Sequence, residues 1–156
     1  MATLGACYIA RAWYASDMRY SVRQIVGSII WWTEGTKAYK DKRWKNVWVS
    51  HVDVTNTNPE IIKSFLEFLR NDIGIEEQRL KLQLQIHEGD DRDDLESYWS
   101  KETKIPKGRF TKTIVRPKGN KHGKSKGTCK VRYSDKETYN KIKKLTQEIL
   151  SSIVKG

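Results

Sequence analysis

One carboxylate stands apart in this chain because of its neighbours. Glu34 follows two tryptophans and a threonine and precedes Gly35 in the stretch WWTEGTK, residues 31–37. A carboxylate at a helix end can bind Mg²⁺, which prefers oxygen ligands; the alternative is a carboxylate that caps the helix or faces water. Metal-dependent phosphodiester hydrolysis needs at least two carboxylates. Glu34 would therefore need a second carboxylate, which a symmetric dimer supplies as Glu34 of its other copy.

Other catalytic constellations are scarce. His51, His87 and His122 have no metal-ligand spacing, and Cys7 and Cys129 are far apart in the sequence. The chain has no nucleophile-elbow, P-loop or dinucleotide-binding glycine motif. The sequence therefore gives no reason to expect a small-molecule substrate.

Charge is the strongest signal of a partner. The net charge is +11, and the segment from Lys101 to Arg132 holds twelve basic residues against one acid, Glu102. A folded domain this basic most often binds a polyanion, because phosphate contacts release counterions; a solvated basic surface is the alternative. Nine basic residues of the neighbouring segments are also expected to contact DNA: Lys37, Lys40, Lys42, Arg43, Lys45, Lys112, Lys121, Lys124 and Lys126.

A second group of candidates follows from strict alternation in RLKLQLQIH, residues 79–87. Period-two alternation predicts a strand with one buried and one solvated face. The solvated row is Arg79, Lys81, Gln83 and Gln85; Thr128, Lys130 and Arg132 form a second row if the later strand joins the same sheet. Arg and Gln can read base edges in the major groove. Both rows lack a carboxylate, which favours DNA contact over an ordinary mixed surface.

The elements that must position these residues can be read from periodicity, caps and breakers. We expect an α+β fold and one domain over residues 1–156, with 1–20 as an uncertain N-terminal extension. The expected helices cover about 21–33, 58–73, the segment after the acidic run through Trp99 to Thr103, and the chain from Asp135 onwards; the expected strands are 47–55, 79–87, 109–116 and 128–133. Residues 37–45 are either a hairpin partner strand or a loop.

No apolar run approaches the about 20 residues that cross a membrane, and the N-terminus lacks a signal-peptide pattern. The two distant cysteines build no disulfide framework. We therefore expect no membrane association and an intracellular, reducing compartment.

The order of these features resembles the LAGLIDADG homing endonuclease family of the single-motif, homodimeric type. The resemblance rests on VGSIIWWTEGTK, on VTNTNPEIIKSFLEFLRNDIGI followed by an alternating strand, and on KVRYSDKETYNKI. It implies an αββαββα arrangement with one extra helix inserted, and an antiparallel sheet saddle with helices on one face. It also implies Glu34 as the catalytic acid, Glu34 and Gly35 at a Mg²⁺ ion, and Gly27, Ser28 and Trp31 at the dimer interface.

Three functions follow as hypotheses. The first is a site-specific endonuclease that cleaves double-stranded DNA as a homodimer with a divalent cation. The second is a non-cleaving DNA- or RNA-binding regulator, or an intron maturase, on the same fold, since fold does not fix function. The third is a basic protein-interaction module with no nucleic-acid affinity.

Overall fold

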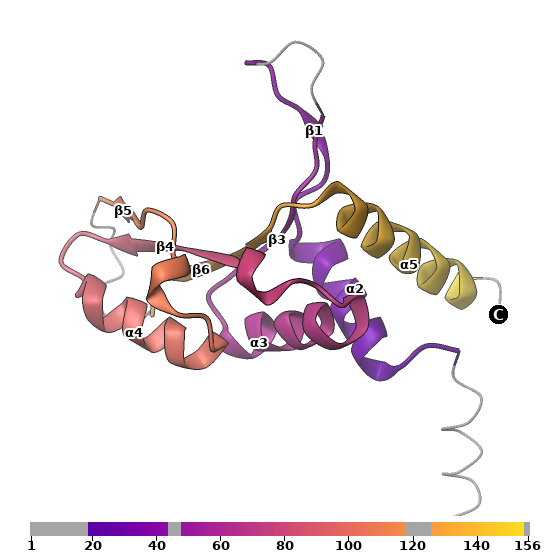
Figure 1. Cartoon of the computed structure of the whole chain (residues 1–156), viewed down its shortest axis with the longest axis horizontal. Helices are drawn as coiled ribbons and strands as arrows, with labels where there is room; N and C mark the ends of the chain where they lie inside the picture. The colour runs from indigo at the N-terminus through magenta and orange to yellow at the C-terminus, as the bar shows by residue number, and fades with distance from the viewer. Residues whose placement is uncertain (1–18, 44–47, 118–125, 155–156) are drawn as a thin grey trace, which may run out of the picture.

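The order of elements follows the expected succession of helices and strands (Figure 1). The structure, a computed structural model, describes residues 19–43, 48–117 and 126–154. Its elements are α2 (Val22–Glu34), β1 (Tyr39–Lys40), β2 (Trp48–Val49), β3 (Val52–Asn56), α3 (Pro59–Phe68), β4 (Lys81–His87), α4 (Arg92–Thr103), β5 (Ile114–Arg116), β6 (Thr128–Tyr133) and α5 (Lys136–Val154). The predicted contacts Lys45, Lys121 and Lys124, and residues 1–18, lie outside the described residues.

The main sheet has the strand order β3-β6-β4-β5. β3, β6 and β4 pair antiparallel, whereas β5 pairs parallel to β4. The α+β class is therefore confirmed, but the prediction of an antiparallel sheet is wrong at β5. The reason is α4, because a helix inserted between two strands returns the chain in the direction in which it left. β1 and β2 form a separate two-stranded hairpin.

One face of the main sheet carries the hydrophobic core. Every second residue of β4 and β6 is buried, beginning with Leu82 and Cys129, as the alternation predicted. α3 and α4 lie along this side of the sheet, and α2 runs between α3 and α5 (Figure 1). α3 contributes Ile62, Phe65 and Leu66 to the same buried cluster. Among residues 19–43, 48–117 and 126–154, no helix lies over the opposite face of the sheet (Figure 1).

α2 begins where the sequence predicted. The Ser21 hydroxyl accepts a hydrogen bond from the backbone N–H of Gln24, and Oε1 of Gln24 accepts one from the backbone N–H of Ser21, which completes a capping box. The helix packs closely on α3, because a Cβ atom at Gly27 would lie 2.1 Å from Cγ of Phe68. Trp31 is 1% exposed, and its ring meets Tyr139 edge-on with centroids 5.5 Å apart.

Gly35 ends α2 for a steric reason. Its backbone is extended, with φ −81°, so no left-handed conformation requires glycine. A Cβ atom here would lie 2.4 Å from the Trp31 carbonyl oxygen and 2.7 Å from its ring. The glycine after Glu34 is thus explained by the tryptophan four residues earlier.

Several predicted boundaries shift. The strand expected over 47–55 is two short strands, with a break at Ser50 and His51. The strand expected from Arg79 begins at Lys81, because 77–79 form a 3₁₀ turn. The strand expected over 109–116 is confined to 114–116. α3 continues through a π-turn at 69–73 and ends at Gly74, whose φ of 74° favours glycine. None of the described helices is long and apolar enough to span a bilayer.

The contact at Gly27 yields a stability prediction. Gly27→Ala gains up to about 1 kcal/mol of helix propensity but forces a methyl group into Phe68, which costs about 1–3 kcal/mol. We expect a lower free energy of unfolding in urea, by about 1–2 kcal/mol. Gly108→Ala is the matched control, since nothing lies within 4 Å of its added Cβ. A Gly27→Ala protein as stable as Gly108→Ala would contradict the close packing of α2 on α3.

Candidate nucleic-acid interface

The open face of the sheet brings the two predicted rows together. Strand pairing sets Lys81 beside Arg132 and Gln83 beside Lys130, and it sets Gln85 beside Thr128. Neighbouring strands lie about 4.8 Å apart, and residues two apart on a strand are about 7 Å apart. These side chains therefore form a regular grid of cationic and amide groups on one surface.

A carboxylate of the neighbouring strand β3 lies beside this grid. Asp53 of β3 is placed opposite Arg132 and is 1% exposed. Its Oδ2 atom lies 3.1 Å from Lys130 Nζ and 3.5 Å from Arg132 Nη2, and Oδ1 accepts a bond of 3.3 Å from the backbone N–H of Thr36. The sequence signal was present, since His51, Asp53 and Thr55 alternate along the polar side of the same segment.

Asp53 changes the role of the two cations beside it. The Lys130 side chain is 19% exposed and that of Arg132 is 41% exposed. A buried charge is tolerated when it is paired and hydrogen-bonded, so these two side chains are held by Asp53. Lys130 in particular is less available for phosphate contact than the exposed Lys81.

His51 adjoins the same cluster. Its Nδ1 atom is buried and has no hydrogen-bond partner among the described residues. Burial lowers the pKa of His51, and the charge of Arg132 lowers it further, while Asp53 acts in the opposite direction. The neutral imidazole is therefore favoured beside the two cations.

Arg79 does not belong to the row in which it was predicted. It lies in the 3₁₀ turn before β4, where its guanidinium donates to the Ser134 carbonyl at 2.9 Å and pairs with Asp135 at 3.3 Å. It also lies 5.0 Å over the Tyr133 ring. Arg79 thus ties the start of β4 to the start of α5 and is corrected to a structural residue.

The other described basic candidates lie outside the grid. Lys112 is exposed, and its carbonyl accepts a bond of 3.3 Å from Gln83, so it adjoins the grid. Lys126 is directed to α4, with its ammonium 5.3 Å from the Tyr98 ring. Lys40, Lys42 and Arg43 are exposed residues of the hairpin segment.

The end of α2 forms a second candidate site. The Lys37 ammonium donates to the carbonyls of Trp31 and Trp32 at 3.0 Å and to that of Gly35 at 2.9 Å. A cation at a helix C-terminus is favoured by the unpaired carbonyls and the helix dipole. Burial lowers the pKa of Lys37, while the charge of Asp53 raises it. Lys37 was predicted to contact DNA, but its ammonium caps the helix.

This geometry does not fit a Mg²⁺ site within one chain. The Gly35 carbonyl, predicted as a metal ligand with Glu34, already accepts a bond from an ammonium. Glu34 is exposed, and no described residue pairs with its carboxylate. In the described part of the chain, no three His, Cys, Asp or Glu residues are grouped to hold an ion.

The residues predicted at a dimer interface do not face outward. Gly27, Ser28 and Trp31 are buried inside their own chain, where α2 faces α3 and α5. Small residues at helical spacing suit contact with α3 as well as they suit contact with a second chain. The opposite face of α2 carries Val22, Val26, Ile29 and Thr33 at spacings of three and four residues. Val22 is 64% exposed and Val26 is 42% exposed.

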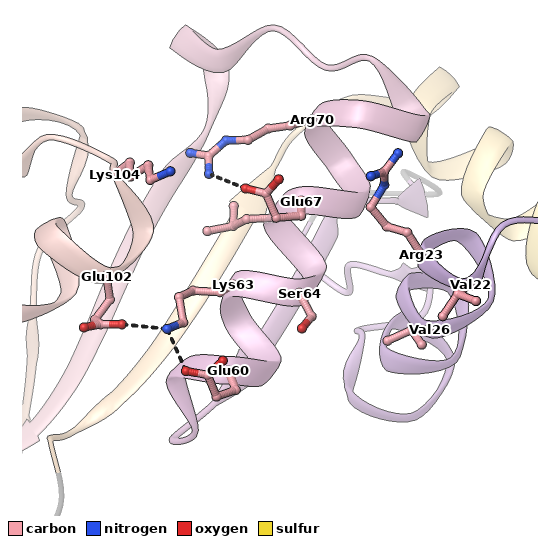
Figure 2. A pocket seen from close by; sticks show the side chains of 11 residues that line it. Val22, Arg23, Val26, Glu60, Lys63, Ser64, Glu67, Arg70, Glu102 and Lys104 are labelled. Carbon is pink, nitrogen blue, oxygen red and sulfur yellow. Dashed lines mark ion pairs between the residues drawn. The ribbon is translucent and has the colours of Figure 1, made fainter.

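A groove of about 590 Å³ adjoins this outward face (Figure 2). Val22 and Val26 form one side of it, and Lys63 and Arg70 of α3 extend over the other side (Figure 2). Lys63 pairs with Glu60 at 2.6 Å and with Glu102 at 3.0 Å, as the dashed lines show. Lys63 is thereby neutralised, whereas Lys104, which also lines the groove, has no ion pair with a described residue.

No family model, curated protein or solved structure matches this chain.

The Lys37 cap yields a prediction. Lys37→Met removes three charge-assisted hydrogen bonds and a favourable charge at the helix end, so we expect a loss of about 1–2 kcal/mol in the free energy of unfolding. The control is Lys143→Met on the exposed side of α5, which should change stability by less than about 0.5 kcal/mol. Chemical denaturation measures both variants. Equal stability of the two variants would contradict a stabilising role of Lys37 at the end of α2.

Proposed function

We propose that this protein binds double-stranded DNA through the open face of the sheet. The observation that carries the proposal is the grid of Lys81, Gln83, Gln85, Thr128, Lys130 and Arg132 on two adjacent central strands. A two-stranded ribbon fits the major groove, which is about 12 Å wide. The net charge of +11 supplies the sequence-independent attraction to phosphate.

Different side chains on this face suit different contacts with DNA. Lys81 is exposed and without an ion pair among the described residues, so it suits phosphate contact. Gln83 and Gln85 are half-buried, and an amide can donate to and accept from adenine in a bidentate pair. Arg132, held by Asp53, keeps part of its guanidinium exposed for a base edge or a phosphate. Double-stranded RNA suits this face less, because its major groove is too narrow for side chains to read.

The binding proposal predicts different effects for different residues. Lys81→Ala should weaken binding to all duplexes and lower the slope of log K against log salt by about 0.9, the value for one lost phosphate contact. Gln83→Ala should relax sequence preference at one base position, with a cost of about 1–3 kcal/mol on the preferred site. Fluorescence anisotropy at several salt concentrations, on a duplex selected from a random library, measures both.

Lys143→Ala on α5 is the control for loss of charge alone, and it should leave binding unchanged. If Lys143→Ala weakens binding as much as Lys81→Ala, contact with DNA is diffuse and the sheet face has no special role. If no duplex is bound at physiological salt, the hypothesis of a basic protein-interaction module replaces this proposal.

We further propose cleavage as a second candidate function, of the kind that the LAGLIDADG resemblance implies. One observation favours it: the Glu34 carboxylate is exposed at the end of α2, where Gly35 bridges to Val54 at the edge of the sheet. Since the described residues of one chain form no group of ligands for Mg²⁺, the proposal requires a homodimer in which each copy supplies Glu34. The outward stripe of Val22, Val26, Ile29 and Thr33 is the surface of α2 that a second copy would cover.

Two variants test this requirement. Val26→Glu places a charge in the proposed interface and should give a monomer in sedimentation analysis, without Mg²⁺-dependent nicking of duplex DNA. Glu34→Gln should keep the dimer but lower the nicking rate. The decrease should exceed the about 10–100-fold loss that follows removal of a group outside the ligand shell. The control Glu148→Gln should behave as the wild type. Equal nicking by Glu34→Gln and the wild type would leave DNA binding as the function.

A further inference from the structure

The β1–β2 hairpin carries two large aromatic side chains that the other described residues leave exposed. Trp48 is 59% exposed and Tyr39 is 47% exposed. The hairpin projects from the body on the side opposite α3 and α4 (Figure 1). It therefore stands on the same side as the open face of the sheet.

The root of this hairpin is anchored to the core. The backbone N–H of Ala38 donates to the hydroxyl of Tyr139, which is buried, at 2.9 Å. Val52, which starts β3 shortly after the hairpin, is fully buried. The two anchors give the projecting strands a defined direction. An isolated two-stranded hairpin is only marginally stable in water. Because this hairpin is anchored at its root, it can hold its exposed aromatic side chains towards a partner.

Charge identifies the class of partner. Lys40 lies directly opposite Trp48 in the hairpin register, with its ammonium 5.5 Å from the indole ring. Lys42 next to it is exposed. Arg43 is neutralised by Asp41, whose pKa it lowers to about 2 by hydrogen bonding. An exposed aromatic ring with cations beside it suits the bases and phosphates of nucleic acid.

The geometry of stacking restricts the partner further. In a regular duplex, each base is covered on both sides by its neighbours, so an indole can stack only where a step is opened or a nucleotide is unpaired. Proteins that insert apolar side chains between base steps unstack and kink the duplex in this way. We propose that Trp48 stacks on a base outside the regular stack, so that the protein prefers DNA with an opened or unpaired step. This inference rests on the proposed DNA binding.

Two duplexes that differ by one unpaired nucleotide test the inference. The wild type should bind the duplex with the unpaired nucleotide more tightly, by about 5- to 150-fold, the usual range for one stacked base. Trp48→Ala should abolish this preference, and Trp48→Phe should keep most of it, because phenylalanine also presents a ring. Trp32→Ala is the control: Trp32 is 47% exposed but lies on α2, so the preference should persist.

A fluorescent base analogue at the unpaired position separates stacking from a general effect on the hairpin. Its emission should be quenched by the wild type and by Trp48→Phe, but not by Trp48→Ala. The inference fails if the wild type binds both duplexes equally or if Trp48→Ala keeps the preference. In both cases, retained binding of the intact duplex still supports the proposed DNA binding. If the protein binds neither duplex, both the stacking inference and the proposed DNA binding are wrong.

Discussion

The close contact between α2 and α3 at Gly27 determines where the candidate groups lie. Because Gly27 has no Cβ, the backbone of α2 reaches the Phe68 ring, and Trp31 is buried one turn later. That orientation turns Val22 and Val26 outward. It also brings the end of the helix to the edge of the sheet, where Gly35 bridges to Val54. A larger residue at position 27 would therefore affect the outward stripe, Glu34 and the root of the hairpin together.

The buried charge of Asp53 links this helix end to the open face. Removal of a carboxylate from water costs several kcal/mol, and here Lys130, Arg132 and the Thr36 N–H offset that cost. The arrangement neutralises part of the charge at the centre of the face and holds two long side chains in place. A fixed arginine loses less entropy on binding than a mobile one. Asp53 thus lowers the positive charge of this face and restricts the movement of Lys130 and Arg132.

Strict patterns predicted the structure well, and ambiguous ones did not. The alternation in β4 correctly assigned each side chain to its face, and the capping box correctly began α2. The inward face of α2 could not be chosen from the sequence, because the outward face also carries apolar residues, namely Val22, Val26 and Ile29. Local periodicity groups residues by face, but which face is buried depends on the partner helix. Likewise, the parallel pairing of β5 and the Lys37 cap depend on how the chain turns after α4 and after Gly35.

The position at which two copies cross on the outward face of α2 decides whether their Glu34 carboxylates can meet. Val26 lies eight residues before Glu34, which is about 12 Å along the helix axis. If two copies crossed antiparallel at Val26, the two carboxylates would lie about 24 Å apart along the axis, whereas the ions of a two-metal site are about 4 Å apart. A crossing near Thr33, one residue before Glu34, would bring the carboxylates together in either orientation. The groove beside Val22 and Val26 instead favours contact near the N-terminal end of α2. An antiparallel dimer centred there would hold the Glu34 carboxylates apart, so cleavage requires a different crossing.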